Sequence, residues 1–351
     1  MEKIIPETVN ITKKVAAFDF DGTLVLQDSD EIAFKNCKEK LHKLVAEGWT
    51  LVIFTNQGGV SKGKVGIEEV KERIQRFLAY ISLPIYVFIA TEYNKYRKPH
   101  PGMWHEMLKE LKIERNDISH NFFVGDAAGR IKVGKTKKDF SCSDRKFAYN
   151  LKIPFQTPEE FFNGKDEREN KWEWDGFDVG RFTIEKRNFN LEPVKDKEKE
   201  IILLIGPQAS GKTSMAKRFC EENLSYVYVN QDSLKTKAKC LKLIRDSVKL
   251  GRSIIVDNTN SCEKNRLEIL NEVKEKGYYI RYVHFNVNKE FAHHLDEMRV
   301  ELHNTTPIPS IAFNIYFKNL RESSLALECD ELVQYYWQPN GNLPKEFFYK
   351  F

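Results

Sequence analysis

Short apolar runs alternate along this chain with longer amphipathic segments, and the alternation occurs in two separate series. In the first series, apolar runs open near Val15, Leu51, Val87 and Phe122. Charged segments with helical spacing follow them, for example over 36–47 and 67–81. In the second series, strands are predicted over 201–205, 226–229, 253–256 and 280–285. This pattern predicts two α/β domains, each with a parallel sheet and helices on its faces.

A segment of different residue composition separates the two series. Between 163 and 199 charged residues are frequent and no strand-like apolar run occurs. Four aromatic residues are spaced along this segment, namely Trp172, Trp174, Phe177 and Phe182. We therefore predict a first domain over 1–162, a connector over 163–199 and a second domain over 200–351. The connector's aromatic side chains are expected to pack against a domain rather than bind a ligand. From Ile311 the sequence reads as helical at first and then as aromatic and irregular, including Tyr335 and Tyr336.

Composition excludes several classes of protein. A length of 351 residues suits two domains, and 41% hydrophobic with 30% charged residues is typical of a globular chain. No apolar stretch approaches the roughly 18 residues of a membrane span. The six cysteines are scattered without a CxxC pair, which favours free thiols in a reducing compartment and gives no support for structural zinc. The net charge of +5 is a weak indication of a polyanionic partner.

Two carboxylates follow the first predicted strand. Asp19 and Asp21 are separated by one residue and precede Gly22. In an extended segment, side chains two residues apart share one side, so one carboxylate can attack a phosphate while the other handles the leaving-group proton. Their negative charge beside a phosphate requires a cation.

Three later segments support this interpretation. One strand ends in Thr55 and Asn56, whose hydroxyl and amide can bind phosphate oxygens, and another apolar run precedes Lys98, which can offset charge. A fourth strand precedes Asp126, a carboxylate suited to Mg²⁺. Because open α/β sheets build their sites at the carboxyl ends of strands, we expect these side chains to meet.

The second series opens with a phosphate-binding loop. An apolar strand at 201–205 is followed by a GxxxxGK[ST] segment and a predicted helix over 214–222. The segment consists of Gly206, Pro207, Gln208, Ala209, Ser210, Gly211, Lys212 and Thr213. Its backbone N–H groups wrap nucleotide phosphates, Lys212 reaches the β- and γ-phosphates, and the Thr213 hydroxyl ligates Mg²⁺.

The next strands in this series also end in polar residues. Asp232 follows the strand at 226–229, where it could accept the proton of an attacking hydroxyl or only cap the following helix. Asp257 and Asn260 follow the third strand and could contact metal-bound water, the acceptor or the phosphate-binding loop. Arg299, in a basic helical stretch, could clamp donor phosphates or be a solvated helix-face arginine.

The four elements of the first series, in their order, resemble the haloacid-dehalogenase phosphatase superfamily. This resemblance implies a Rossmannoid fold in which Asp19 is the nucleophile that forms an aspartyl-phosphate. Asp21 would be the general acid and then the base that activates water. Thr55 and Lys98 would hold the phosphoryl group, and Mg²⁺ would be bound by Asp19, Asp126 and the backbone carbonyl of Asp21.

The order of motifs over nearly the whole chain closely resembles the eukaryotic polynucleotide kinase/3′-phosphatase family. The most specific segments are IFTNQGG, YRKPHPGMW, FFVGDAAGR, KKDFSCSDRKFA, PFQTPEEFF, GPQASGKT, VNQD and VDNTN. The resemblance implies a phosphatase domain followed by a P-loop kinase domain, with Mg²⁺ and ATP as cofactors. It implies removal of 3′-phosphates and phosphorylation of 5′-hydroxyls at DNA strand breaks, and hence a nuclear location, with a mitochondrial pool as an alternative.

The same resemblance suggests residues that contact the nucleic acid. Five of the nine residues from Arg130 to Lys138 are basic, and Arg130 and this run would lie near the phosphatase mouth. Lys62 and Lys64 would also grip strand phosphates. Ser141 and Asp144 fall in the segment after the metal aspartate, where Asp144 would support the metal shell.

The sequence also departs from that family. Its animal members usually carry an N-terminal forkhead-associated domain, whereas this chain starts at the phosphatase, so recruitment through such a domain is not expected. Gln231 stands where relatives tend to have arginine. The lid region matches poorly. These departures affect the expected binding of the substrate more than the expected catalytic steps.

Three alternatives compete with DNA end processing. A small-molecule phosphatase fused to a small-molecule kinase is disfavoured, because the chain lacks the cysteine-rich metal loop often carried by histidinol-phosphate phosphatases and has a basic run after Asp126. A non-catalytic scaffold is disfavoured because the catalytic-type residues of both sites are present together. RNA ends stay open, since nothing in the sequence visibly reads a 2′-hydroxyl.

Overall fold

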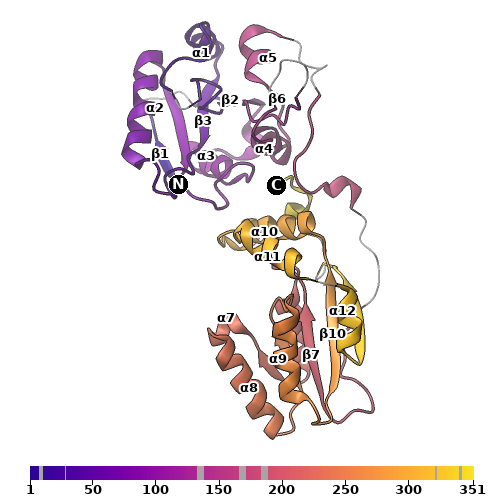
Figure 1. Ribbon diagram of the computed structural model, residues 1–351. Helices are drawn as coiled ribbons and strands as arrows, with labels where there is room; N and C mark the ends of the chain where they lie inside the picture. The colour runs from indigo at the N-terminus through magenta and orange to yellow at the C-terminus, as the bar shows by residue number, and fades with distance from the viewer. Residues whose placement is uncertain are drawn as a thin grey trace. The chain divides into compact units, whose positions relative to one another are not determined.

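The protein is described here by a computed structural model covering residues 1–7, 11–27, 29–132, 138–165, 171–182, 189–320, 322–339 and 342–351. It divides into two compact units (Figure 1). The first unit comprises Met1–Gly180, Val300–Pro307 and Lys345–Phe351, and the second comprises Arg181–Arg299 and Ile308–Pro344. The first unit thus extends beyond residue 162, and the domain boundaries predicted at 162 and 200 stay a prediction.

The first unit is built on a six-stranded sheet in the order β1-β4-β3-β2-β5-β6. In chain order its strands are Glu2–Ile4 (β1), Lys14–Phe18 (β2), Thr50–Asn56 (β3), Ile85–Ala90 (β4), His120–Val124 (β5) and Phe155–Gln156 (β6). The sequence did not suggest the short edge strand β1, which pairs antiparallel with β4, while all other pairings are parallel. The parallel sheet predicted from the apolar runs is otherwise confirmed.

Helices cover both faces of this sheet, as the sequence predicted (Figure 1). Along β2, Ala16 and Phe18 point to the face covered by α1 (Cys37–Ala46) and α2 (Ile67–Ile81). The intervening residues Val15 and Ala17 point to the other face, whose helices are α3 (Gly102–Leu111) and α4 (Ser143–Leu151). Successive strand residues alternate between faces, so a fully apolar strand serves both layers. The smaller helices of this unit are α5 (Pro158–Asn163), η1 (Arg115–Asp117), η2 (Val179–Arg181) and η3 (Lys345–Phe348).

Aromatic residues of the predicted connector pack on α4. The Arg145 guanidinium lies 4.2 Å from the centre of the Trp172 ring, and the Trp174 ring lies 5.3 Å from that of Tyr149. The expectation that these two tryptophans pack against a domain is therefore confirmed.

The last residues of the chain also pack against α4 in the first unit. The Asn150 side chain exchanges hydrogen bonds with the Lys350 backbone at 2.8 and 2.9 Å and donates a third, of 3.0 Å, to the carbonyl of Pro99. Because Pro99 directly follows Lys98, a segment more than 200 residues away in sequence helps to hold the loop that carries this lysine.

The second unit is built on a five-stranded, all-parallel sheet in the order β11-β10-β7-β9-β8. Its strands are Glu200–Ile205 (β7), Val227–Val229 (β8), Ile254–Asp257 (β9), Tyr279–Asn286 (β10) and Glu331–Tyr336 (β11). The four strands predicted in this half are confirmed within one residue at each end. The helices are α6 (Lys212–Glu222), α7 (Gln231–Leu234), α8 (Lys237–Lys249), α9 (Glu263–Val273), α11 (Ser310–Asn319) and α12 (Glu322–Glu328), together with α10 (Lys289–His303), whose last residues from Val300 belong to the first unit.

One expectation for the C-terminal stretch is wrong. Tyr335 and Tyr336 were expected in irregular structure, but they end β11, which pairs in parallel with β10 over six residues. The strand lies at the sheet edge and is only partly buried, so it lacks the continuous apolar run that identified the central strands. The helix expected from Ile311 is confirmed as α11.

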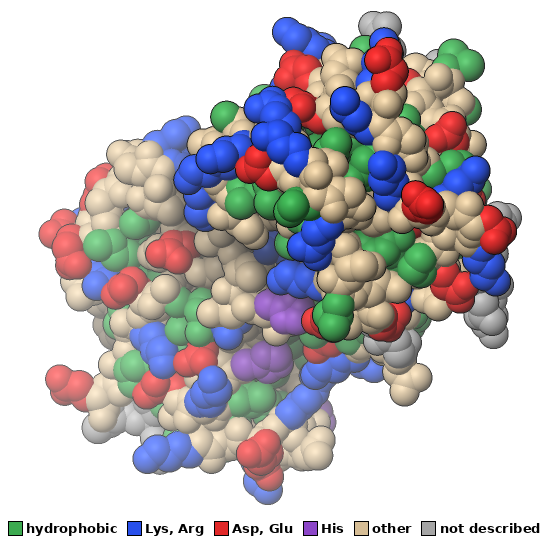
Figure 2. Space-filling model, turned by 90° about the horizontal axis from the view of Figure 1, so that it is seen from below, with side chains coloured by type: hydrophobic (Ala, Val, Ile, Leu, Met, Phe, Trp, Pro, Cys, Tyr) green, Lys and Arg blue, Asp and Glu red, His purple; other side chains and the backbone are tan. Residues whose placement is uncertain are grey.

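Charges of both signs share the surface. Lys and Arg side chains are interspersed with Asp and Glu over the face shown in Figure 2. Among the described residues, no helix combines the length and the apolar character that crossing a membrane would require.

A buried ion pair joins β7 to β10, which are neighbouring strands of the second sheet. The Arg281 guanidinium donates hydrogen bonds of 2.7 and 3.0 Å to the carboxylate of Glu200, which is 1% exposed and also accepts from the Tyr226 hydroxyl. Replacing Glu200 by Ala leaves the Arg281 charge buried without this partner. We expect the second unit to lose about 3 kcal/mol of stability.

Hydrogen exchange followed by mass spectrometry tests this expectation. Peptides of β7 and β10 should exchange faster in Glu200→Ala, while those of β2 and β3 should be unchanged. Lys43→Ala, which removes an exposed pair with Glu47, is the control and should change neither set. Unaltered β7 protection in Glu200→Ala would contradict the stabilising role of the pair.

Candidate active sites

The first candidate site lies at the carboxyl ends of three neighbouring parallel strands. Asp19 directly follows β2, Thr55 and Asn56 end β3, and Asp126 follows β5 by one intervening residue. Since β3, β2 and β5 are adjacent in the sheet, the parallel pairing brings the ends of these strands to one edge. The predicted convergence of these segments is confirmed.

Three carboxylates gather there around one lysine. One oxygen from each of Asp19, Asp126 and Asp144 lies within 4.8 Å of the others. The Lys98 ammonium, 3% exposed, lies 2.6 Å from Asp19 and 2.7 Å from Asp144. If ionised, three carboxylates and one ammonium leave two negative charges in excess within a buried space.

The pKa values reflect this imbalance. Burial raises the pKa of Asp19 to about 7, opposed by Lys98 and reinforced by Asp144. Burial, together with the charges of Asp19 and Asp144, raises the pKa of Asp126 to about 9. Although burial alone would lower it, the two neighbouring carboxylates raise the pKa of Lys98, which therefore stays an ammonium.

These residues fit a divalent cation. Oxygen ligands of this kind suit Mg²⁺, and two positive charges would balance the excess. Asp126 Oδ1 is buried and has no hydrogen-bond partner among the described residues. Gly22, at φ +74°, makes room for the Asp126 carboxylate, since a Cβ there would stand 2.4 Å from Asp126 Oδ2. The sequence placed Asp144 only in a supporting position, whereas the structure puts its carboxylate within the cluster.

The Asp21 side chain lies outside this cluster and has its own partners. Its carboxylate accepts a 2.7 Å hydrogen bond from Gln57 Nε2 and forms an ion pair with Arg73 of α2. Arg73 was missed by sequence reasoning, because one arginine among the charged residues of an amphipathic helix carries no signal of its own.

Thr55 and Asn56 have different surroundings. Thr55 is buried, and its hydroxyl accepts a 2.8 Å hydrogen bond from Gln57. Asn56 was expected to bind phosphate oxygens, but its amide group bonds both the N–H and the C=O of Lys98, at 2.9 and 3.1 Å. Asn56 therefore fixes the backbone of Lys98, and its contact with phosphate oxygens stays a prediction.

The second candidate site is the loop between β7 and α6. The Phe285 side chain lies against Gly206 and leaves no room for a larger residue, since a Cβ at position 206 would stand 2.7 Å from the Phe285 Cβ. Lys212 begins α6 and is buried, and its ammonium donates to the carbonyl of Pro207 at 2.5 Å. Burial lowers its pKa to about 8, although Asp257 and Asp232 oppose this effect. Phosphate oxygens would stabilise its charged form.

Asp257 connects this loop to the neighbouring strands. Its carboxylate accepts 2.7 Å hydrogen bonds from the hydroxyls of Thr213 and Tyr228 and a longer one from Asn230. The sequence gave no reason to select Tyr228 or Asn230, because their contact with Asp257 depends on the pairing of β8 with β9. Asp257 thereby orients the hydroxyl that is expected to ligate Mg²⁺.

Asn260 holds the same loop from a second side. Its amide donates a 2.8 Å hydrogen bond to the carbonyl of Leu204, and the Thr259 carbonyl accepts from the N–H of Gly206. The sequence left three kinds of contact open for Asp257 and Asn260, and the structure shows contacts to the phosphate-binding loop and its strand.

Comparison with known proteins assigns the chain. The family model for polynucleotide kinase 3 phosphatase matches residues 14–162, and an AAA domain model matches residues 201–305. A bifunctional polynucleotide phosphatase/kinase of Acanthamoeba polyphaga mimivirus is 35% identical, covering 87% of this chain and 80% of that protein. The bifunctional polynucleotide phosphatase/kinase of Schizosaccharomyces pombe is 34% identical, covering 87% and 75%. This chain belongs to the bifunctional polynucleotide phosphatase/kinase family.

A relative from Arabidopsis thaliana matches less than half of the chain. Its polynucleotide 3′-phosphatase is 36% identical over 44% of this chain and 24% of that protein. The family resemblance drawn from the motifs, and the order of a phosphatase domain before a P-loop kinase domain, are thus confirmed. Phosphatases and kinases of these families typically use Mg²⁺ and ATP.

Of the family-implied contacts with nucleic acid, Lys62 and Lys64 lie in the loop after β3. The Lys62 ammonium lies 4.8 Å from the centre of the Tyr93 ring, and Arg97, which was not selected from the sequence, lies 4.4 Å from it. Hydrogen bonding by Lys62, opposed by burial and reinforced by the charges of Arg97 and Lys64, lowers the pKa of Tyr93. These side chains form a cationic and aromatic cluster.

Arg130 and Ser141 make protein contacts instead. The Arg130 guanidinium pairs with Asp139 at 3.0 Å and Glu159 at 2.8 Å, so its charge is largely offset within the fold. The Ser141 hydroxyl donates to Ser143. Lys132 and Lys138 of the basic run are exposed, and residues 133–137 lie outside the described residues.

In the second unit, Asp232 lies exposed on the short helix α7. The alternative that it caps this helix is not supported, because Asn230 is the N-cap residue and accepts from the N–H of Ser233 at 3.0 Å. Arg299, expected as a lid arginine, pairs with Asp296 one turn earlier on α10 at 2.6 Å.

A binding measurement tests the carboxylate cluster. Asp126→Asn removes one of its three carboxylates, and we expect affinity for Mn²⁺ or Tb³⁺, measured by calorimetry or luminescence, to fall at least about ten-fold. Asp30→Asn, which removes an exposed carboxylate, is the matched control and should bind normally. Equal affinities in the two variants would contradict a cation site at Asp126.

Proposed function

We propose that this chain processes broken DNA ends, removing 3′-phosphates and phosphorylating 5′-hydroxyls with ATP so that a ligase can join them. One observation supports this proposal most strongly: this chain, a member of the family, contains both kinds of site. The first is the buried carboxylate site with Asp19 and Lys98, and the second is the P-loop whose Thr213 hydroxyl bonds Asp257. Such a substrate favours a nuclear location. The mimivirus and yeast relatives carry the name of both activities.

In the proposed phosphatase reaction, Asp19 attacks the phosphorus of the 3′-phosphate. A bond forms between an Asp19 oxygen and phosphorus, and the bond between phosphorus and the 3′ oxygen breaks as Asp21 gives that oxygen a proton. Asp21, now a carboxylate, takes a proton from water. The water oxygen then attacks the aspartyl-phosphate, which frees Asp19 and inorganic phosphate.

The surroundings of these residues support the assignment. Gln57 and Arg73 orient the Asp21 side chain and favour the carboxylate that takes a proton from water, and Asn56 fixes the backbone of Lys98. Lys98 and Thr55 would hold the phosphoryl oxygens. Mg²⁺ bound by Asp19, Asp126, Asp144 and the Asp21 carbonyl would neutralise the excess negative charge of the site and of the substrate phosphate.

In the proposed kinase reaction, the segment Gly206–Thr213 binds ATP and Asp232 accepts the proton of the 5′-hydroxyl. The 5′ oxygen then bonds to the γ-phosphorus while the bond from that phosphorus to the β–γ bridging oxygen breaks, which releases ADP. Lys212 would offset the charge that develops on the transferred group. Mg²⁺ would be held by Thr213, whose hydroxyl Asp257 orients.

Two variants separate the activities. A nicked duplex with a 3′-phosphate and a 5′-hydroxyl is incubated with ATP and Mg²⁺, and both termini are scored. Asp19→Asn should abolish 3′-phosphate removal and leave 5′ phosphorylation intact, because the nucleophile is lost. Lys212→Ala should have the opposite effect. If either variant lost both activities while remaining folded, two independent sites would be untenable.

Salt dependence tests for a polyanionic substrate. Contact with a few strand phosphates should weaken binding of a 3′-phosphate oligonucleotide by more than about ten-fold between about 50 and 200 mM salt, measured by fluorescence anisotropy. The KM for a small phosphate ester should vary far less. A flat response of the oligonucleotide would instead indicate a small-molecule substrate. Matched DNA and RNA strands reveal the preferred polymer.

A further inference from the structure

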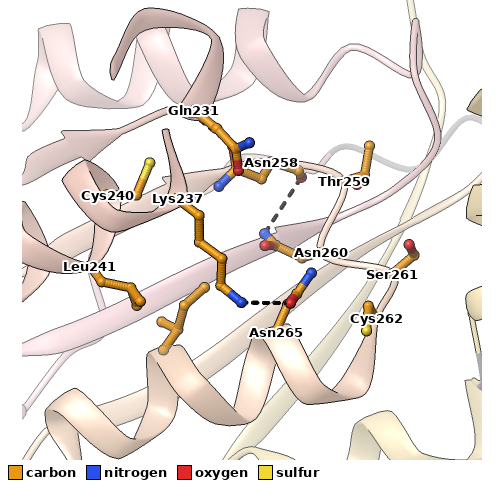
Figure 3. Close-up of a pocket in the computed structure, with 11 residues that line it drawn as sticks. Gln231, Lys237, Cys240, Leu241, Asn258, Thr259, Asn260, Ser261, Cys262 and Asn265 are labelled. Atoms are coloured by element: carbon orange, nitrogen blue, oxygen red, sulfur yellow. Dashed lines mark hydrogen bonds between the residues drawn. The ribbon is translucent and has the colours of Figure 1, made fainter. Parts of the chain in front are cut away.

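A small pocket in the second unit lies beside the proposed kinase residues but contains none of the phosphate-binding loop (Figure 3). Its cavity volume is about 90 Å³, and it is bounded by the loop after β9 and by residues of α8 and α9. This is several times the roughly 10–15 Å³ that a cavity needs to hold a single water. The pocket therefore has room for a small planar group, such as the edge of one nucleobase.

Side-chain amides dominate the polar part of the lining. Gln231, Asn258, Asn260 and Asn265 all contribute to it. Asn258 Oδ1 accepts from the backbone N–H of Gln231, and Asn265 Oδ1 accepts from Lys237 at 2.7 Å. Within the described parts of the chain, no hydrogen bond is recorded for the Gln231 side-chain amide or for the NH₂ groups of Asn258 and Asn265. These groups supply donors and one acceptor to the pocket.

Apolar side chains also line the pocket. Cys240, Leu241 and Ile269 supply this part, and Thr259 and Ser261 add two further polar residues. A nucleobase combines an apolar face with an edge of donors and acceptors, and Asn and Gln amides pair with such edges. A phosphate suits the pocket poorly, because Lys237, its one cationic lining residue, already pairs with Glu268 at 2.6 Å.

The position of the pocket indicates which base it receives. Gln231 immediately precedes Asp232, the residue assigned to the 5′-hydroxyl proton. In the sheet order, β9 and β8 lie to one side of β7, which carries the phosphate-binding loop at its end. We propose that the pocket binds the base of the 5′-terminal nucleotide of the acceptor strand. This inference rests on the proposed kinase function and adds to it a determinant of acceptor affinity.

Base binding would place the reacting oxygen. The terminal sugar follows its base directly, so a base held by Gln231 and Asn265 brings the 5′-hydroxyl toward Asp232, one residue from Gln231. A fixed base would therefore raise the fraction of bound strands in a reactive orientation.

The experiment compares two 5′-hydroxyl oligonucleotides that differ only in whether the terminal nucleotide carries its base. With the full-length protein, we expect the abasic strand to have a kcat/KM about ten-fold lower, chiefly through a higher KM, because base-edge hydrogen bonds are lost. Gln231→Ala and Asn265→Ala should lower kcat/KM for the normal strand to a similar level. Their penalty for the abasic strand should nearly vanish.

Controls separate this result from a folding defect. In both variants the KM for ATP should stay within about two-fold of that of the unaltered protein, which shows an intact nucleotide site. Lys249→Ala, an exposed substitution on α8 outside the pocket, should retain the full abasic penalty.

Two outcomes would overturn the inference alone. One is equal kcat/KM for the normal and abasic strands with the unaltered protein, and the other is a raised KM for ATP in the pocket variants with acceptor kinetics unchanged, which would assign the pocket to the donor adenine. If the unaltered protein phosphorylated no 5′-hydroxyl strand at all, the kinase function itself would fail, and this inference with it.

Discussion

Buried negative charge is the constraint on which the first unit depends. Asp19, Asp126 and Asp144 converge on Lys98, and their charges exceed what one ammonium can balance. Much of the surrounding structure keeps this arrangement in place. Asn56 bonds both backbone groups of Lys98, and Gly22 leaves space for the Asp126 carboxylate. The site is thus poised to take up a divalent cation and a phosphate together, because each offsets charge that would otherwise repel the other.

In the second unit, hydrogen bonds to one carboxylate and one amide hold the site. Its phosphate-binding loop is fixed from β9, where Asp257 orients Thr213 and Asn260 holds the carbonyl of Leu204. Beneath that layer, Arg266 is fully buried and donates to the carbonyls of Asn260 and Ser261 while pairing with Glu328. The loop that carries these polar residues is therefore anchored to α9 and α12. In both units a strand next to the one bearing the reactive group supplies the residues that orient it.

Sequence reasoning worked best where strands are central and short-range chemistry is unambiguous. The strands leading to Asp19 and Gly206 were found because they are buried on both faces and read as continuous apolar runs. The edge strands β1 and β11 were missed because only part of their surface is buried. Arg73, Tyr228 and the Asn150 contact with Lys350 were missed for another reason: each depends on a partner that is distant in sequence.

The sequence by itself determined the two α/β units and their order, and it located the motifs at the strand ends, because these features are written in strand runs and in segments a few residues long. Only the tertiary structure decided what those residues touch. It placed Asp144 within the carboxylate cluster, joined the Asn56 amide to the backbone of Lys98, and offset the charge of Arg130 with Asp139 and Glu159. The physical reason is that charge balance and hydrogen bonding depend on distances between strand ends and helices, and those distances are set when the sheet forms.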